Sequence, residues 1–184
     1  MINNLEIINV AIEVATYAHR HQYRKGTDIP YISHPFAVGM ILAQAECDVE
    51  VVAAGILHDV VEDTEITLLE IEQRFGRRVA QIVSGVSEPD KSLTWEERKK
   101  HTLEFLKTAP LEIRLVSCAD KLHNIVSIRR DMEKIGEAVW SRFNRGKEQQ
   151  AWYYRNVLVS LGHSGRFKLL DILQQEIDTV FRTK

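Results

Sequence analysis

Apolar residues recur at every third or fourth position along most of the chain, and its few glycines and prolines fall mostly between such stretches. This spacing is typical of helices that bury one face. The pattern predicts helices over residues 5–19, 35–45, 49–61, 67–76, 77–87, 111–135, 148–161 and 166–181, with a basic helix opening at 94. The stretch 49–61 is apolar on nearly all sides, as a central buried helix would be. The predicted fold class is all-α.

Two Thr-x-x-Glu sequences mark the starts of predicted helices. Thr67 precedes Glu70 and Thr94 precedes Glu97 by the spacing of a capping box, in which each side chain bonds a free backbone N–H of the other residue. Gly76 should end the first of these helices, and a polar linker through Pro89 and Asp90 should precede the second.

The composition excludes several classes of protein. The 184 residues carry 24 Lys+Arg against 26 Asp+Glu, a formal net charge of −2, so we expect no nucleic-acid and no membrane partner. Cys47 and Cys118 lie in no CxxC or Cys/His cluster, which argues against a disulfide scaffold or a zinc finger. The chain start resembles no signal peptide, and there is no apolar run of about 18 residues. We therefore expect a cytoplasmic protein with reduced thiols.

Four ionisable residues follow directly on the apolar run of the central helix, namely His58, Asp59, Glu62 and Asp63. Burying an unpaired carboxylate is costly. At about 100° per residue, the helix places all four side chains in one patch, within an arc of roughly 140°. A metal ion could neutralise the crowded carboxylates. Alternatively, the helix simply ends there, with a hydrogen-bonded histidine and solvated acids.

Two further candidates lie elsewhere in the chain. His34 precedes Pro35 at the start of a predicted helix, and Asp120 stands on an apolar helix face next to Ala119. A carboxylate on such a face needs a partner. We hypothesise that packed helices gather two histidines and two carboxylates into a mononuclear metal site. Its members are His34, His58, Asp59 and Asp120.

A site rich in oxygen ligands suits Mn²⁺, Fe²⁺ or Mg²⁺, whereas a structural zinc site would be closed by four protein ligands. Glu62 and Asp63 would lie beside the metal, where carboxylates can move protons to or from water. The pattern therefore favours hydrolysis.

Four separated motifs resemble the HD-fold hydrolase domain of RelA/SpoT-type alarmone enzymes in residues, order and spacing. They are Arg24-Lys25-Gly26, Pro30-Tyr31-Ile32-Ser33-His34-Pro35, His58-Asp59-Val60-Val61-Glu62-Asp63-Thr64 and Ala119-Asp120-Lys121-Leu122-His123-Asn124. The similarity runs from about residue 10 to 161. It implies an all-α HD-domain helical bundle with a buried metal site that binds Mn²⁺, ahead of Fe²⁺ or Mg²⁺. It also implies removal of the 3′-pyrophosphate of ppGpp or pppGpp, which leaves GDP or GTP.

The resemblance assigns roles to individual residues. It matches metal ligands to His34, His58, Asp59 and Asp120, and the catalytic acidic pair to Glu62 and Asp63. It places Arg24 against the guanine base, Lys25 as a neighbouring basic group and Asn124 as a polar contact to the nucleotide. Ser127 falls where the family often has threonine, and we expect it to contact the substrate with a shorter side chain.

The resemblance is to the small, single-domain alarmone hydrolases, because no synthetase domain follows within the sequence. We expect one HD hydrolase domain over residues 1–184, with a core from about 5 to 161 and a C-terminal helix from about 166 to 181. The expected partner is a small nucleotide substrate, and homo-oligomerisation stays open. Two alternatives remain, a phosphohydrolase acting on another nucleotide such as NADPH, and a non-catalytic nucleotide sensor. The acidic pair argues against the sensor.

Overall fold

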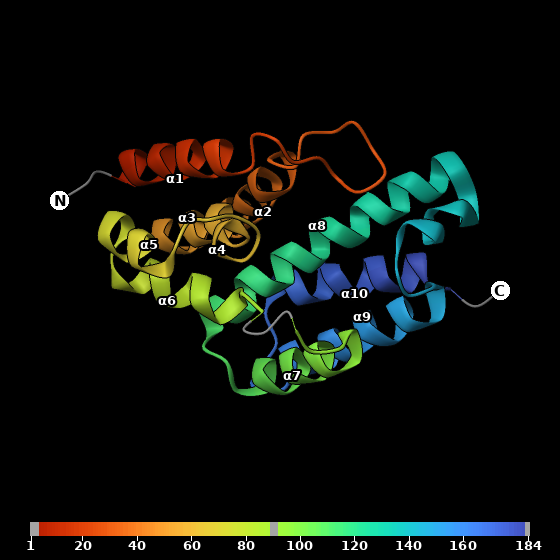
Figure 1. Cartoon of the computed structure of the whole chain (residues 1–184). Helices are drawn as coiled ribbons and strands as arrows, with labels where there is room; N and C mark the ends of the chain where they lie inside the picture. Colours follow the sequence, from red (N-terminus) through yellow and green to blue (C-terminus); the bar gives the residue numbers. More distant parts are fainter. Residues whose placement is uncertain (1–3, 89–91, 183–184) are drawn as a thin grey trace. The chain divides into compact units, whose positions relative to one another are not determined.

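Figure 1 shows the computed structural model, which describes residues 4–88 and 92–182. Its elements are α1 (Asn4–Ala18), α2 (Ser33–Gln44), α3 (Val49–Leu57), α4 (Val60–Asp63), α5 (Leu68–Phe75), α6 (Arg77–Val86), α7 (Trp95–Thr108), α8 (Leu111–Ile135), the 3₁₀ helix η1 (Gly136–Arg142), α9 (Lys147–Gly162) and α10 (Lys168–Val180). Within these ranges the only β contact is an isolated antiparallel bridge between Tyr23 and Pro30. The predicted all-α class is confirmed. The predicted linker through Pro89 and Asp90 lies outside the described residues.

The chain divides into two compact units. The first comprises residues 1–89 and 110–120, and the second comprises residues 90–109 and 121–184. Helix α8 therefore begins in the first unit and continues into the second, which also contains the whole of α10. The expectation of a single HD domain over residues 1–184 stays a prediction. Every helix of the described residues is too short or too polar to span a bilayer.

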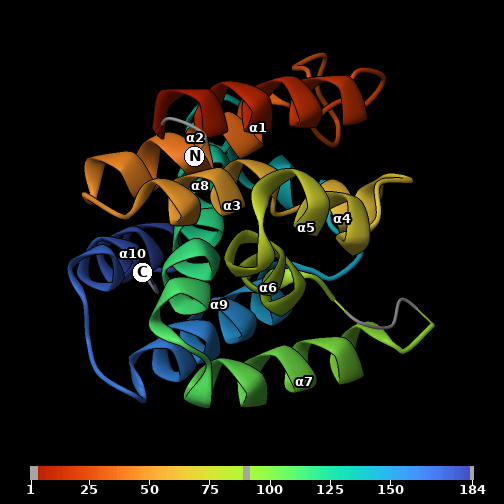
Figure 2. The ribbon, with the colours of Figure 1, turned by 90° about the vertical axis from the view of Figure 1, so that its left-hand side faces the viewer.

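Helix α3 is the centre of the first unit. It packs against α1, α2 and α6, and α5 packs against α6 (Figures 1 and 2). Every residue from Val51 to Leu57 is buried, which confirms the prediction of a central helix that is apolar all round. Burial of this many aliphatic side chains is the main force that holds the surrounding helices in place.

Two glycines let α2 and α3 approach closely. A Cβ atom added to Gly55 of α3 would overlap the side chain of Leu42 of α2, and one added to Gly39 would overlap the side chain of Ile56. Leu42 is fully buried and Ile56 is nearly so, so neither side chain can turn aside into solvent. The close approach brings the start of α2 near the end of α3, where the candidate histidines lie.

We expect Gly55→Ala to destabilise the protein by about 1–3 kcal/mol, because the added methyl group overpacks a filled interior. Urea denaturation of the metal-free variant and the wild type would measure this difference. A denaturation midpoint equal to that of the wild type would contradict a close contact between α2 and α3 at Gly55.

The central helix is shorter than predicted. We expected one helix over residues 49–61, but α3 ends at Leu57 and α4 begins at Val60, with a turn at His58 and Asp59. His58 Nδ1 lies 2.8 Å from the carbonyl oxygen of Gly55, the acceptor that a continuing helix would offer to the N–H of Asp59. The histidine side chain thus competes with the helix for its acceptor. The prediction of a continuous helical face for the four ionisable residues was wrong.

Both predicted capping boxes are present. Glu70 N–H donates to Thr67 Oγ1 at 3.3 Å, and Thr67 N–H donates to Glu70 Oε2 at 2.8 Å. Thr94 and Glu97 make the same pair of bonds at the start of α7. Gly76 ends α5 with a φ of 86°, a conformation that favours glycine. These helix ends are set by local sequence.

In the second unit, α9 packs against α7 and α10. Two ion pairs connect the predicted charged loop over residues 142–147 to neighbouring helices. Arg142 pairs with Asp131 of α8, and Arg145 pairs with Glu96 of α7. Helix η1, which ends at Arg142, was not predicted.

Candidate metal centre

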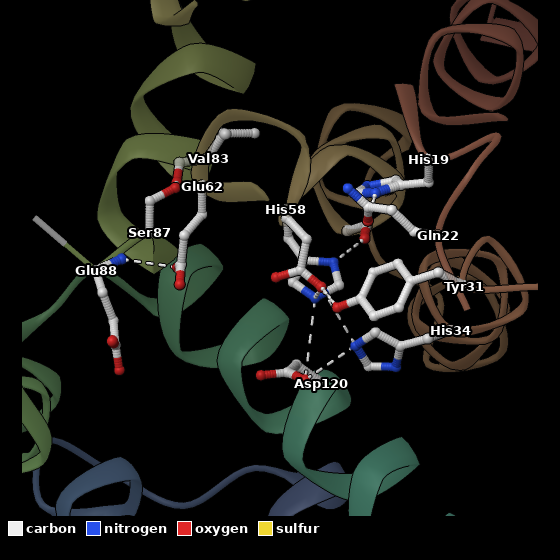
Figure 3. A network of polar contacts seen from close by, with 12 residues as sticks. His19, Gln22, Tyr31, His34, His58, Glu62, Val83, Ser87, Glu88 and Asp120 are labelled. Carbon is white, nitrogen blue, oxygen red and sulfur yellow. Dashed lines mark hydrogen bonds and ion pairs between the residues drawn. The ribbon is translucent and has the colours of Figure 1, made fainter. Parts of the chain in front are cut away.

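Three helical segments of the first unit bring three potential metal ligands together. His34 lies in the first turn of α2, His58 directly follows α3, and Asp120 lies on α8. One ligand atom from each residue lies within 4.8 Å of the other two. His34 Nε2 is 3.2 Å from Asp120 Oδ1, and the two imidazole rings meet edge to face with centroids 5.0 Å apart. These three residues, shown in Figure 3, form the candidate metal centre.

Asp59 brings a second carboxylate to the same place. Its Oδ2 lies 3.0 Å from His58 Nε2 and 3.6 Å from His34 Nε2. The four residues predicted as ligands are therefore neighbours, although the compact group of three contains Asp120 and not Asp59. The role of Asp59 as a fourth ligand stays a prediction.

The surroundings of His58 fit a bound cation. Because Nδ1 bonds the Gly55 carbonyl, Nε2 is the nitrogen that faces the carboxylates. This Nε2 is buried and makes no hydrogen bond of good geometry with any described residue. Burial opposes a charge on His58, but the carboxylates of Asp59 and Asp120 outweigh it and raise its pKa to about 9. A positive charge is thus favoured at this point, and a divalent metal would supply one.

The acidic pair lies on α4, beyond Asp59. Glu62 is half-buried, and its Oε2 accepts a hydrogen bond of 3.0 Å from the backbone N–H of Glu88, two residues past the end of α6 (Figure 3). Burial raises the pKa of Glu62; the Glu88 N–H partly offsets this rise, and the charge of Asp59 adds to it. The Asp63 side chain is exposed. A carboxylate with a raised pKa accepts a proton more readily, as a general base must.

Two of the predicted nucleotide-binding residues lie in the loop between α1 and α2. Arg24 is half-buried, and its Cζ atom lies 5.9 Å from the centroid of the Tyr31 ring. Lys25 is exposed. Tyr31 in turn donates a hydrogen bond to Asp59, so Tyr31 connects Arg24 to this candidate ligand. Its role toward a nucleotide stays a prediction, as does that of Lys25.

The other two predicted nucleotide-binding residues follow Asp120 along α8. Asn124 and Ser127 lie four and seven positions after it, a spacing that puts all three on one side of the helix. Ser127 Oγ donates to the carbonyl oxygen of His123 at 2.9 Å, so this hydroxyl is engaged with its own helix. The substrate roles of both residues stay predictions.

Sequence reasoning gave no role to Tyr31, although this residue stands in one of the motifs, three positions before His34. Its hydroxyl donates to Asp59 Oδ2 at 2.6 Å. Burial and the charge of Asp59 raise the pKa of Tyr31, so that the hydroxyl keeps its proton. Its position close to His34 in the sequence could have indicated a role at the site. Its contact with Asp59, 28 positions away, is made only in the folded chain.

The sequence pattern of the family described as the HD domain matches residues 11–149, a range that includes all four candidate metal ligands. The chain belongs to the HD-domain family. The predicted all-helical HD bundle with a buried site for a metal is confirmed by this match together with the geometry of His34, His58 and Asp120.

Relatives of this HD domain carry names that describe alarmone chemistry. The protein named guanosine-3′,5′-bis(diphosphate) 3′-pyrophosphohydrolase MESH1 from Danio rerio is 40% identical over 151 residues, which cover 80% of this chain and 78% of that protein. The protein of the same name from Mus musculus is 38% identical over 145 residues. The bifunctional (p)ppGpp synthase/hydrolase SpoT of Escherichia coli is 37% identical over 128 residues, but these cover only 18% of that enzyme. The resemblance to RelA/SpoT-type hydrolase domains is confirmed.

Two solved structures are similar to this HD domain. One is a metazoan orthologue of SpoT described as hydrolysing ppGpp, with a TM-score of 0.77 and 29% identity over 96% of this chain and 94% of that chain. The other is a protein from Listeria monocytogenes, with a TM-score of 0.76 and 38% identity over 82% of this chain and 99% of that chain. The sequence comparison and the structure comparison thus both include SpoT or an orthologue of SpoT.

The raised pKa of Glu62 has a consequence for the stability of this HD domain. Because folding raises the pKa of this carboxyl, the free energy of unfolding falls as the pH rises from the unfolded-state pKa to the folded-state pKa, and it stays lower above the folded-state pKa. We expect metal-free Glu62→Gln to be more stable than the wild type above that pKa, with the advantage disappearing as the pH falls and the wild-type carboxyl becomes protonated. Urea denaturation across a pH series would measure it. An advantage that grows toward low pH would contradict the expected sign.

Proposed function

We propose that this HD domain is a metal-dependent phosphohydrolase that removes the 3′-pyrophosphate from ppGpp or pppGpp and leaves GDP or GTP. The observation that carries this proposal is the convergence of His34 from α2, His58 from the turn after α3 and Asp120 from α8, with ligand atoms within 4.8 Å of one another. The names of relatives that match about four-fifths of the chain support the choice of substrate.

We propose Mn²⁺ as the metal, ahead of Fe²⁺ or Mg²⁺, because two imidazoles and two carboxylates suit a borderline to hard cation. A divalent metal supplies Lewis-acid polarisation of the phosphate and a water of lowered pKa. His34 and His58 would hold it through Nε2. The carboxylates of Asp59 and Asp120 would complete the protein ligands and leave room for the substrate.

The acidic pair would handle the protons of hydrolysis. Glu62 is fixed by the Glu88 N–H, and its raised pKa suits a group that takes a proton from the attacking water. Asp63 is exposed on the same short helix, where it can exchange that proton with solvent. Neither step needs a nucleophilic side chain. Cys118 is a poor candidate for such a nucleophile, because burial raises the pKa of its thiol and the thiol would not ionise readily.

The nucleotide would be held by the residues that the family resemblance assigns. The Arg24 guanidinium can stack on a base and pair with phosphate, while the Lys25 ammonium offers a point charge. Asn124 would give a polar contact from α8. Ser127 would contribute through a hydroxyl whose donor is already engaged with the helix, so that it could only accept a hydrogen bond from the nucleotide.

Two competing functions would use the same metal centre but differ in the substrate or in whether it is hydrolysed. One is hydrolysis of another nucleotide such as NADPH, and the other is nucleotide binding without turnover. Initial rates with ppGpp, pppGpp, NADPH and GTP, measured at saturating Mn²⁺ alongside equilibrium binding of each, would separate them. We expect the alarmones to have the highest kcat/KM. A higher kcat/KM for NADPH, or tight alarmone binding without turnover, would refute the proposed substrate or the proposed catalysis, respectively.

We also propose a cytoplasmic location. Cys47 and Cys118 are both free thiols, as is usual in a reducing compartment. The formal net charge of −2 provides no attraction to nucleic acids or to anionic membranes.

A further inference from the structure

Tyr31 lies on the segment that leads into α2 and is held there by its backbone. Its N–H donates to the carbonyl oxygen of Gln22 at 2.9 Å, and its own carbonyl accepts from the N–H of His34 at 2.9 Å. The loop behind it is closed by the bridge between Tyr23 and Pro30. The tyrosine therefore stands in a fixed place relative to one of the candidate ligands.

The side chain of Tyr31 reaches across to a second candidate ligand. Its hydroxyl donates to Asp59 Oδ2 at 2.6 Å, and this same oxygen faces His58 Nε2 and His34 Nε2. The phenol ring also meets the ring of His34 edge to face, with centroids 5.8 Å apart (Figure 3). One tyrosine thus touches two of the four residues that would hold the metal.

A second pair of residues supports the ring of Tyr31 from behind. The ring of His19, which is almost fully buried, lies 5.0 Å from it between centroids. Gln22 Nε2 donates to the backbone carbonyl of Asp63 at 2.9 Å, so Gln22 Oε1 must face His19 Nδ1, which donates to it at 2.7 Å. The loop is thus anchored at two points, by Tyr31 to Asp59 and by Gln22 to Asp63 at the end of α4.

We propose that Tyr31 is a positioning residue of the metal centre, whose hydroxyl fixes the Asp59 carboxylate toward the two histidines and thereby raises the affinity for the metal. An aspartate carboxylate can rotate about its side-chain bonds, and holding one oxygen in place removes that freedom before the metal arrives. This inference rests on the proposed metal centre and does not depend on the identity of the substrate.

The test compares Tyr31→Phe with the wild type by calorimetric titration of Mn²⁺ into the metal-free protein. The variant keeps the ring and its contacts with His19 and His34 and loses only the hydroxyl. We expect its Kd for Mn²⁺ to rise about 10- to 100-fold, the usual effect of losing an outer partner of a metal ligand. The thermal midpoint of the metal-free variant should equal that of the metal-free wild type.

Tyr23→Phe is the matched control, because it removes the same atom from an exposed tyrosine of the same loop. It should bind Mn²⁺ with the wild-type Kd. A wild-type Kd for Tyr31→Phe would overturn the inference, and so would a loss of metal-free thermal stability that accounts for the weaker binding. A wild-type protein that binds no Mn²⁺ would instead refute the metal centre itself, so the two failures are distinguishable.

Discussion

Replacing Asp120 with alanine should abolish Mn²⁺ binding and hydrolysis together. The carboxylate of Asp120 is 3.2 Å from His34 Nε2 and 3.9 Å from His58 Nε2, and it is the only acidic member of the compact group of three among the described residues. Without it, two imidazoles and Asp59 remain, with less negative charge to hold a divalent cation. Calorimetric titration of Mn²⁺ and a rate assay on the same preparation would measure both losses.

Glu133→Ala is the control for this experiment. Glu133 lies on the same helix, is mostly exposed and pairs at the surface with Arg129, so its loss should leave metal binding and rate unchanged. Stoichiometric Mn²⁺ binding by Asp120→Ala with the wild-type Kd would show that Asp120 is not a metal ligand.

Replacing Glu62 with glutamine should lower kcat about 10²- to 10⁴-fold, the usual contribution of a general acid or base. The affinity for Mn²⁺ should stay near that of the wild type, because Glu62 lies on α4 outside the compact ligand group. The amide oxygen of glutamine can still accept the hydrogen bond from the Glu88 N–H, so the local structure should persist. Rates at saturating Mn²⁺ and substrate, together with a metal titration, would measure both effects.

Glu65→Gln makes the same chemical change at an exposed position three residues further along and should turn over at the wild-type rate. Normal turnover by Glu62→Gln would remove Glu62 from the proton transfers. A loss of metal binding in that variant would instead make Glu62 part of the metal centre.

The parts of the fold that depend on neighbouring residues could be predicted from the sequence. The capping boxes at Thr67 and Thr94 involve residues three positions apart, and the long helix α8 follows directly from its apolar period. The break after Leu57 could not be predicted in this way, because it depends on a histidine side chain that takes a backbone acceptor. A turn of helix and a distorted turn have the same pattern of apolar and polar residues.

The candidate metal centre could likewise be predicted only in part. His34 and Asp120 were recognisable because a histidine at a helix start and a carboxylate on an apolar face need an explanation. Tyr31 and Gln22 needed none, since a half-buried tyrosine and a polar loop residue are ordinary. Their contacts join residues 28 and 41 positions apart, and only the folded chain brings these together.

Phosphorus NMR of the products formed from ppGpp by the Mn²⁺-loaded protein tests the proposed hydrolysis at its chemical step. We expect GDP and free pyrophosphate in equal amounts, with no orthophosphate, and no reaction when a chelator removes the metal. Unchanged ppGpp in the presence of Mn²⁺, or release of orthophosphate in place of pyrophosphate, would contradict it.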